Sequence, residues 1–240
     1  HVEDNSGNLL NEFDGVVSPL VYDKSTAITT LANDGGTPIK FNMRNNILFS
    51  GNTTAVGGKF KFTFIVPRDI DYAYGPGKIS YYASDPDANM AGYSNVIVGG
   101  FAEATAFDTT GPIISIYMND TLFRSGGITD DNPRMLAIIE DEGGINTTGA
   151  GIGHDITGYF DNDINSSFVL NNYFINDFDN YMRGKIEYNL SDLAEGNHSV
   201  TIKAWDNFNN SSQNTLLFLV ETGGEFILTN LMNYPNPFIA

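Results

Sequence analysis

The chain has 240 residues, of which 41% are hydrophobic and 12% aromatic, enough for the cores of one large domain or two ordinary ones. Its net charge of −17 disfavours nucleic acids and anionic membranes as partners, whereas cations, including Ca²⁺, are allowed. Because cysteine is absent, disulfides, zinc thiolate sites and thiol nucleophiles are excluded from this chain. No apolar run approaches the roughly 20 residues of a membrane-spanning helix, and the opening HVEDNSGN reads as a turn, not a signal peptide.

Alternation of apolar and polar residues, the pattern of β-strands, recurs through residues 1–108. It is clearest in GGKFKFTFIVP, where one face of a predicted strand carries Phe60, Phe62, Phe64 and Val66. Gly57 and Gly58 predict a hairpin turn to a partner in NILFSGNTTAV, and Pro67 ends the run. The other predicted strands are GVVSPLVYD, AITTL, PIKFNM, GKISYYA and NVIVGGF. Short strands with frequent turn signals indicate an antiparallel β-sandwich.

A second set of strands follows the polar junction FDTTGPIIS, which runs through Gly111. The predicted strands are IISIYM, RMLAIIED, DITGYF, SFVLN, GKIEYNL, the run from Val200 to Ala204, and NTLLFLV. The turn DNFNNSS joins the last two, and this final stretch looks like the end of a bacterial immunoglobulin-like domain. We therefore expect two tandem immunoglobulin-like β-sandwiches, residues 1–108 and 109–222, followed by a glycine hinge.

Two histidines raise the question of catalysis. His198 begins a strand beside a turn, where an imidazole usually bonds a nearby backbone group. His154 lies beside Asp155 in the glycine-rich GAGIGHDIT, but no G-x-S-x-G elbow accompanies it. GAGIG also lacks the Lys-Ser/Thr ending of a phosphate loop. A structural role is favoured for both, and we predict no catalytic residue in this chain.

Two acidic loops have the opening spacing of a calcium loop, Asp85-Asp87-Asn89 and Asp161-Asp163-Asn165. Both lack the following glycine and the later bidentate carboxylate. A looser calcium site at the domain junction stays open, with Asp108, Asp206 and Asn207 as candidate ligands. The alternative is that these residues only terminate strands. We predict no required cofactor, and expect that folding does not need a metal.

The end of the chain, NYPNPF, resembles the start of the C-terminal sorting domain of proteins exported by the type IX secretion system of Bacteroidetes. The matching residues are Tyr234, Pro235, Asn236, Pro237 and Phe238. Three further segments resemble the region after the peptidase domain in PorU-like sortases, the gingipain-type cysteine peptidases of that pathway. These are FDGVVSPLVYDKSTAITTLANDGGTP, GKFKFTFIVPRDIDYAYGPGKISYYA and GIGHDITGYFD.

This resemblance covers essentially the whole chain and implies a secreted parent at the outer-membrane surface or outside the cell. Such proteins carry a His–Cys dyad on an upstream caspase-like domain, and they act with outer-membrane secretion components. This chain has no cysteine, so it cannot hold the dyad, and His154 is not assigned to it. The resemblance implies a non-catalytic region, with residues 223–240 as linker and first strand of a third sandwich.

Two functions follow as hypotheses. The first is a spacer and interaction module that orients the peptidase and the sorting domain. The second is a ligand- or glycan-binding module of a surface adhesin, in which exposed aromatic rings stack on sugars. Its candidate rings are Tyr72, Tyr74, Tyr81 and Tyr82. Coplanar exposed rings on one sheet favour the second function, and a large contact between the domains favours the first.

Deleting residues 225–240 is expected to leave the melting temperature of residues 1–222 nearly unchanged. A lone strand leaves its backbone groups unpaired, and Pro235 and Pro237 each remove a donor. Differential scanning calorimetry of the two chains tests this expectation. Unfolding of residues 109–222 after the deletion would instead make the segment an integral strand of that domain.

Overall fold

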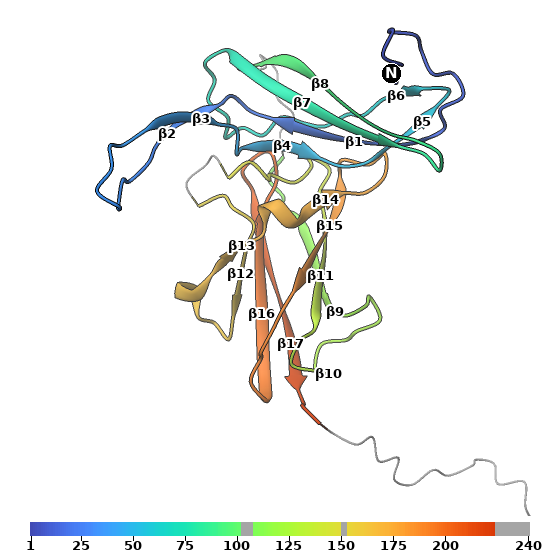
Figure 1. Cartoon of the computed structure of the whole chain (residues 1–240). Helices are drawn as coiled ribbons and strands as arrows, with labels where there is room; N and C mark the ends of the chain where they lie inside the picture. Colours follow the sequence, from blue (N-terminus) through green and yellow to red (C-terminus); the bar gives the residue numbers. More distant parts are fainter. Residues whose placement is uncertain (102–107, 150–152, 224–240) are drawn as a thin grey trace, which may run out of the picture.

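The computed structural model describes residues 1–101, 108–149 and 153–223 (Figure 1). Within them the chain is almost wholly β, in several antiparallel sheets, which confirms the predicted all-β class. Helical structure in this part is limited to two single turns, η1 (Ile164–Ser166) and η2 (Asn171–Tyr173). No helix among these residues has the length and apolar character to cross a membrane. The predicted first strand of a third sandwich lies outside the described residues.

The N-terminal half is built on a six-stranded antiparallel sheet that lies across one end of the C-terminal half (Figure 1). Its strand order is β6 (Lys59–Phe60), β5 (Thr53–Val56), β1 (Gly15–Tyr22), β7 (Gly75–Ser84) and β8 (Asn89–Val98), and β4 (Ile47–Ser50) pairs with the far end of β1. A separate hairpin projects from this sheet and consists of β2 (Thr26–Thr29) and β3 (Lys40–Met43).

Strand β1 contains a proline although it is paired on both sides. On one side its partner is β5 up to Val17 and β4 from Leu20 onward. Pro19 lies in this interruption, where its carbonyl accepts a 3.4 Å hydrogen bond from the N–H of Gly51. Proline has no N–H to give to a sheet, so the change of partner strand accommodates it.

The segment after β6 covers one face of the sheet without joining its ladder. The sequence predicted a strand through Val66, but β6 ends at Phe60. The predicted turn at Gly57 and Gly58 is present, with positive φ at both residues. The ladder stops at Ala55 although β5 begins at Thr53, because the N–H of Thr54 donates to the carboxylate of Asp179 at 3.0 Å and the Thr53 hydroxyl lies 2.7 Å from the carbonyl oxygen of Lys61.

The aromatic alternation of this segment still directs its packing. Phe62 and Phe64 stack on Phe49 of β4, with ring centroids 5.6 Å and 5.1 Å away. All three belong to a core with Val21 and Ile70. The sequence was therefore right about the face on which Phe62 and Phe64 lie and wrong about the hydrogen bonding of their backbone.

The C-terminal half is a sandwich of two sheets around one core. The first sheet has the order β10 (Gly127–Thr129), β17 (Ser211–Val220), β16 (Gly196–Trp205), β12 (Thr157–Phe160) and β13 (Phe168–Val169). The second has the order β14 (Phe174–Asn176), β15 (Arg183–Asn189), β11 (Arg134–Glu140) and β9 (Ile113–Met118). Among the described pairs of this half, β10 with β17 is parallel and the rest are antiparallel.

Most strands of this half were predicted from alternation. Met135, Ala137 and Ile139 of β11 are fully buried, as are Val200 and Ile202 of β16. Strands β10 and β14 were not predicted, because three residues are too few to display a period of two.

Replacing Phe49 by alanine is expected to destabilise the protein by about 3–5 kcal/mol, because the change leaves a cavity beneath two stacked rings. Urea unfolding followed by circular dichroism measures the loss. The matched control is Val56→Ala on the neighbouring β5, where the side chain is exposed and the expected change is below about 0.5 kcal/mol. Equal losses in the two variants would contradict the assigned core.

Candidate functional site

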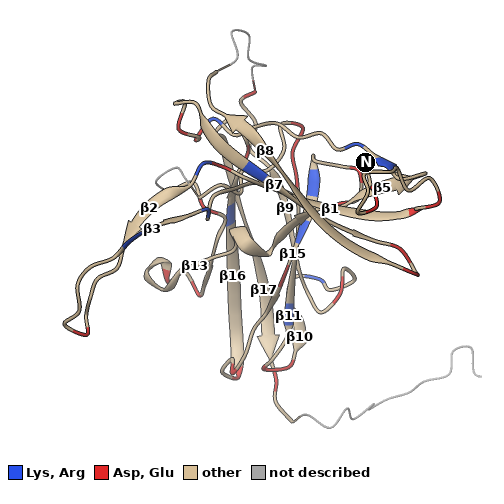
Figure 2. Cartoon of the chain, turned by 45° about the horizontal axis from the view of Figure 1, so that its top comes forward, with Lys and Arg blue, Asp and Glu red and all other residues tan. Residues whose placement is uncertain are grey.

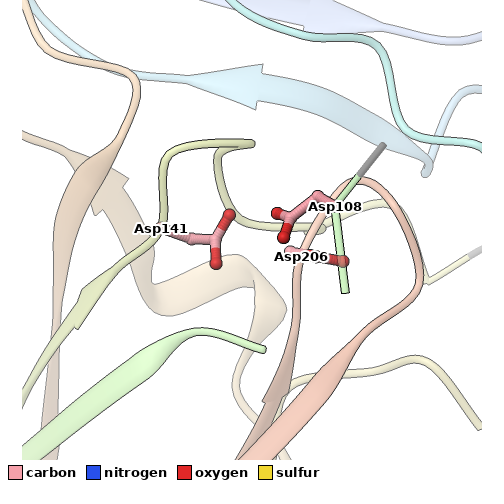
Figure 3. A group of neighbouring side chains, drawn as sticks. All are labelled: Asp108, Asp141 and Asp206. Atoms are coloured by element: carbon pink, nitrogen blue, oxygen red, sulfur yellow. The ribbon is translucent and has the colours of Figure 1, made fainter. Parts of the chain in front are cut away.

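Three aspartates meet at the end of the C-terminal sandwich that faces the N-terminal sheet (Figure 3). Asp108 precedes β9, Asp141 follows β11 and Asp206 follows β16. Strands β9 and β11 are antiparallel, so the start of one and the end of the other lie at the same end of the sandwich. One carboxylate oxygen from each aspartate lies within 4.8 Å of the others.

Each carboxylate also stabilises its own turn. Asp206 is fully buried and accepts hydrogen bonds from the backbone N–H groups of Phe208 and Asn210, at 2.9 Å and 2.7 Å. Asp108 accepts from the backbone N–H of Thr110 at 2.9 Å, and Asp141 accepts from that of Gly143 at 2.7 Å. Asp206 follows the end of β16 and so fits the alternative considered from the sequence, strand termination, whereas Asp108 stabilises a turn that precedes β9.

The convergence of three acidic groups shifts their pKa values. Burial, followed by the charges of Asp206 and Asp108, raises the pKa of Asp141 to about 6. Burial also raises the pKa of Asp206, whereas hydrogen bonds from Thr110 lower the pKa of Asp108. At neutral pH the cluster therefore carries repulsion that a shared proton or a divalent cation relieves.

The predicted calcium ligands fit this cluster in part. The structure brings Asp108 and Asp206 together and adds Asp141, which the sequence analysis missed. Asn207 is 4% exposed; its Nδ2 donates to Gly143 O at 2.8 Å, and its Oδ1 has no hydrogen-bond partner among the described residues. Calcium takes six to eight oxygen ligands, and these carboxylates supply only some of them. Binding of Ca²⁺ by Asp108, Asp206 and Asn207 stays a prediction.

A signal for Asp141 was present in the sequence. Asp141 is the last residue of the predicted strand RMLAIIED, Asp206 comes two residues after the predicted run from Val200 to Ala204, and both precede a turn rich in glycine or asparagine. Two carboxylates that end strands in the two sheets of one sandwich are candidates for the same end of the fold. The strand order was needed to bring them together, because the residues lie far apart in the chain.

His154 connects the two halves of the molecule. Its Nδ1 lies 2.6 Å from Oδ2 of Asp69, and its ring centroid lies 4.1 Å from that of Trp205. The neighbouring Asp155 instead accepts a 3.0 Å hydrogen bond from Nδ2 of Asn171. A histidine held between a carboxylate of the opposite half and an indole fits the structural role favoured from the sequence.

His198 makes the backbone contact that the sequence predicted. Its Nε2 lies 2.8 Å from the carbonyl oxygen of Ala194, and its Nδ1 lies 2.8 Å from Oδ2 of Asp161. Both partners are acceptors, so the doubly protonated imidazolium satisfies both bonds. The hydrogen bond that His198 donates to Asp161 accordingly raises the pKa of His198.

The two acidic loops stabilise turns. Asp85 accepts hydrogen bonds from the N–H groups of Asp87 and Ala88 in the β7–β8 turn. Asp163 caps the short helix η1.

The aromatic candidates for glycan stacking do not share a sheet face. Tyr72 and Tyr74 are exposed but lie on the loop before β7. Tyr81 packs on Phe60, while the hydroxyl of the exposed Tyr82 donates to Asn89. The sorting-type motif, residues 234–238, lies outside the described residues.

The protonation of Asp141 predicts a pH-dependent stability. Its pKa in the folded state exceeds the ordinary 3.8, so the folded state binds the proton more tightly and stability falls as the pH rises from about 4 to above 6. Asp141→Asn removes this penalty. In chelator we expect its melting temperature to exceed that of the wild type at pH 7.5, with the difference shrinking towards pH 4.

The same measurement with Ca²⁺ tests the cation prediction. Bound calcium raises the melting temperature of the wild type at pH 7.5, and Asp141→Asn loses most of that rise. Asp192→Asn, a change at an exposed loop carboxylate, serves as the control and keeps the wild-type response. No response of the wild type to Ca²⁺ would count against the site. A large loss of stability in chelator alone would contradict the expectation that folding needs no metal.

No protein-family model matches the sequence, and no curated protein matches it. Among solved structures, the chain is similar to one described as dimeric latent PorU from Porphyromonas gingivalis. The sequence identity is 32%, the match covers 93% of this chain and the TM-score is 0.47. The match covers 21% of the solved chain, so this sequence is similar to a region that spans about a fifth of PorU.

Proposed function

We propose that the chain is a non-catalytic β-sandwich region of a PorU-like, gingipain-type cysteine peptidase, in which it acts as a rigid spacer and interaction module. The observation that carries this proposal is the polar junction between the two halves. Several separate segments of each half contribute to the junction, and together they oppose both rotation and separation.

The centre of the junction is Asp69, on the segment that covers the N-terminal sheet. Its Oδ2 lies 2.7 Å from Nδ2 of Asn146 and 2.6 Å from Nδ1 of His154. Asn146 is fully buried, and its Oδ1 accepts hydrogen bonds from the N–H and hydroxyl of Thr148. A buried amide with each polar atom bonded holds one geometry, because any shift leaves a polar group unpaired.

A second contact lies on the other side of the junction. The carboxylate of Asp179 accepts a 3.0 Å hydrogen bond from the N–H of Thr54, and it lies 2.7 Å from the Thr54 hydroxyl and 2.6 Å from that of Thr53. The N–H of Asp179 in turn donates to the carbonyl oxygen of Asn52. Two contacts at a distance from each other define an orientation, which a single contact does not.

A third contact adds apolar area. The guanidinium carbon of Arg68 lies 4.9 Å from the ring centroid of Phe208, and the N–H of Arg68 donates to the carbonyl of Asn207. Tyr181 of the C-terminal half packs on the core that contains Phe49. We propose residues 1–108 and 109–222 as two domains that this junction holds in one orientation.

In the parent protein, the module would separate an upstream peptidase domain from the sorting-type segment after residue 223. The sequence segments that resemble PorU-like sortases support this context. They also support a location in the cell envelope, at the outer-membrane surface or outside it, with type IX secretion components as partners. The catalytic His–Cys dyad belongs to the upstream domain in this proposal.

A ligand- or glycan-binding role in an adhesin is the alternative. It is supported by the exposure of Tyr72 and Tyr74 at an apolar cleft of about 740 Å³. It has less support than the spacer role, because these rings lie on a loop and the described aromatic pairs do not include them. The polar junction, in contrast, is built by several segments.

Asp69→Asn tests the spacer role. We expect the wild type to unfold in one calorimetric transition and the variant in two, because the loss of charge weakens the contacts to His154 and Asn146. Small-angle X-ray scattering should show a broader distribution of interatomic distances in the variant. The matched control is Asp71→Asn, two residues away, whose carboxylate caps its own turn at Ala73. A single, unshifted transition in both variants would refute a junction that sets the orientation.

A further inference from the structure

We infer that a divalent cation held by Asp108, Asp141 and Asp206 regulates the junction between the two halves, because cation binding at this cluster and closure of the Asp69 junction stabilise each other. The inference rests on the proposed spacer role and adds what controls it. The bound cation determines how narrow the range of orientations of the two halves is.

Acidic residues are common in this chain, but few of them converge. Asp and Glu number 29, and in the described ranges they lie mostly in loops and turns (Figure 2). Among the described residues, Asp108, Asp141 and Asp206 form the one group of three acidic, histidine or cysteine side chains with ligand atoms within 4.8 Å of one another. Asp206 is fully buried, where water screens its charge poorly. Three carboxylates in this arrangement repel one another unless a proton or a cation lies between them.

A second observation, independent of these charges, points to a ligand at the same place. In the part of the chain that the structure describes, the buried side-chain atoms without a hydrogen-bond partner are Trp205 Nε1, Asn207 Oδ1 and Asn209 Oδ1. All three belong to residues 205–209, on either side of Asp206. A buried polar atom without a partner is unfavourable, so their grouping in one turn indicates that a further species binds there.

The side chain of Asn207 lies against the turn of Asp141. Its Nδ2 donates to Gly143 O at 2.8 Å, and the N–H of Gly143 donates to the Asp141 carboxylate at 2.7 Å. Asn207 is 4% exposed, so bulk water does not satisfy its Oδ1. An amide oxygen beside three carboxylates is a set of hard oxygen ligands, which suits Ca²⁺, whereas structural Zn²⁺ is usually held by Cys and His. The structure therefore assigns the site to Ca²⁺.

The turn of Asp206 is bonded directly to the N-terminal half. The N–H of Arg68 donates to Asn207 O at 3.1 Å, and the Arg68 guanidinium carbon lies 4.9 Å from the ring centroid of Phe208. Arg68 precedes Asp69 in the covering segment. The residue next to the centre of the junction thus contacts the turn that supplies a cation ligand.

The turn of Asp141 reaches the junction by a second route. The N–H of Asn207 donates to Gly144 O at 3.1 Å, which joins the turns of Asp141 and Asp206. Asn146, two residues after Gly144, donates from its Nδ2 to Asp69 at 2.7 Å. A cation that draws the two turns together therefore stabilises both of their connections to the N-terminal half.

The affinity for the cation tests this coupling. Trp205 is the only tryptophan of the chain and is adjacent to Asp206, so it sensitises the luminescence of Tb³⁺ bound in place of Ca²⁺. Competition by Ca²⁺ then gives the Ca²⁺ affinity of the whole chain. Asp141→Asn, which removes a ligand, should lose most of this affinity. Asp69→Asn removes no ligand but should weaken Ca²⁺ binding about fivefold or more, because coupling between two sites is reciprocal.

The matched control for Asp69→Asn is Asp71→Asn, which should bind Ca²⁺ as the wild type does. The reciprocal effect is measured on the orientation of the halves. Because the chain lacks cysteine, Ala91→Cys and Asn197→Cys place spin labels at exposed positions of the two halves. In the otherwise wild-type chain, Ca²⁺ should narrow the distribution of distances between the labels, and a chelator should broaden it.

Three results would overturn the inference: a wild type without sensitised Tb³⁺ luminescence, equal Ca²⁺ affinity in Asp69→Asn and the wild type, or the same distance distribution in Ca²⁺ and in chelator. The spacer role fails separately. If Asp69→Asn unfolds in two transitions yet binds Ca²⁺ as the wild type does, the junction sets the orientation without control by the cation. Circular dichroism shows that each variant is folded.

Discussion

The carboxylate of Asp69 joins the two halves of the molecule. It contacts a fully buried amide, Asn146, and an imidazole, His154, that both belong to the C-terminal sandwich. Burying such polar groups is unfavourable unless each has a hydrogen-bond partner. Here each half supplies hydrogen-bond partners for polar groups of the other. The segment that carries Asp69 also supplies Phe62 and Phe64 to the core of the N-terminal sheet. One stretch of chain thus contributes both to the packing of the first half and to its contacts with the second.

The same end of the sandwich gathers the acidic cluster. Asp108 enters β9 there, and the turns after β11 and β16 bring Asp141 and Asp206 beside it. The turn after β11 continues into a buried run that includes Asn146, and the turn after β16 contains Phe208, which contacts Arg68. The acidic cluster and the contacts between the two halves therefore involve the same turns. A change of charge among the aspartates reaches the junction through one or two residues.

The alternation of apolar and polar residues in the sequence was sufficient to predict much of the fold. Alternation defined β11 and β16 because both strands have one face in a single large core, where a period of two is fully expressed. It overextended β6, because a backbone can keep alternate side chains on one face without a ladder partner. The partner was missing for a reason outside the segment itself, because the N–H of Thr54 in β5 donates to Asp179 of the other half.

The candidate site was harder to predict from the sequence than the strands were. Asp108 and Asp206 were identified as junction residues from their places at strand ends, but the pairing of Asp69 with His154 spans 85 residues and leaves no local signature. The position of Asp141 beside Asp206 could be predicted only with the strand order. Contacts that depend on how sheets stack cannot be read from spacing, because the same spacing occurs in strands that never meet.

The separation of Thr54 and Asp179 along the chain, 125 residues, has a consequence for the order of events in folding. A chain that is synthesised or exported from its N-terminus completes the first sheet well before Asp179 emerges. Until then Thr53 and Thr54 of β5 lack the carboxylate that they contact in the complete structure. Contacts between residues so far apart in the chain close a long loop, which disfavours their formation early in folding. A molecule that has not yet formed them is more exposed to proteases and to other chains.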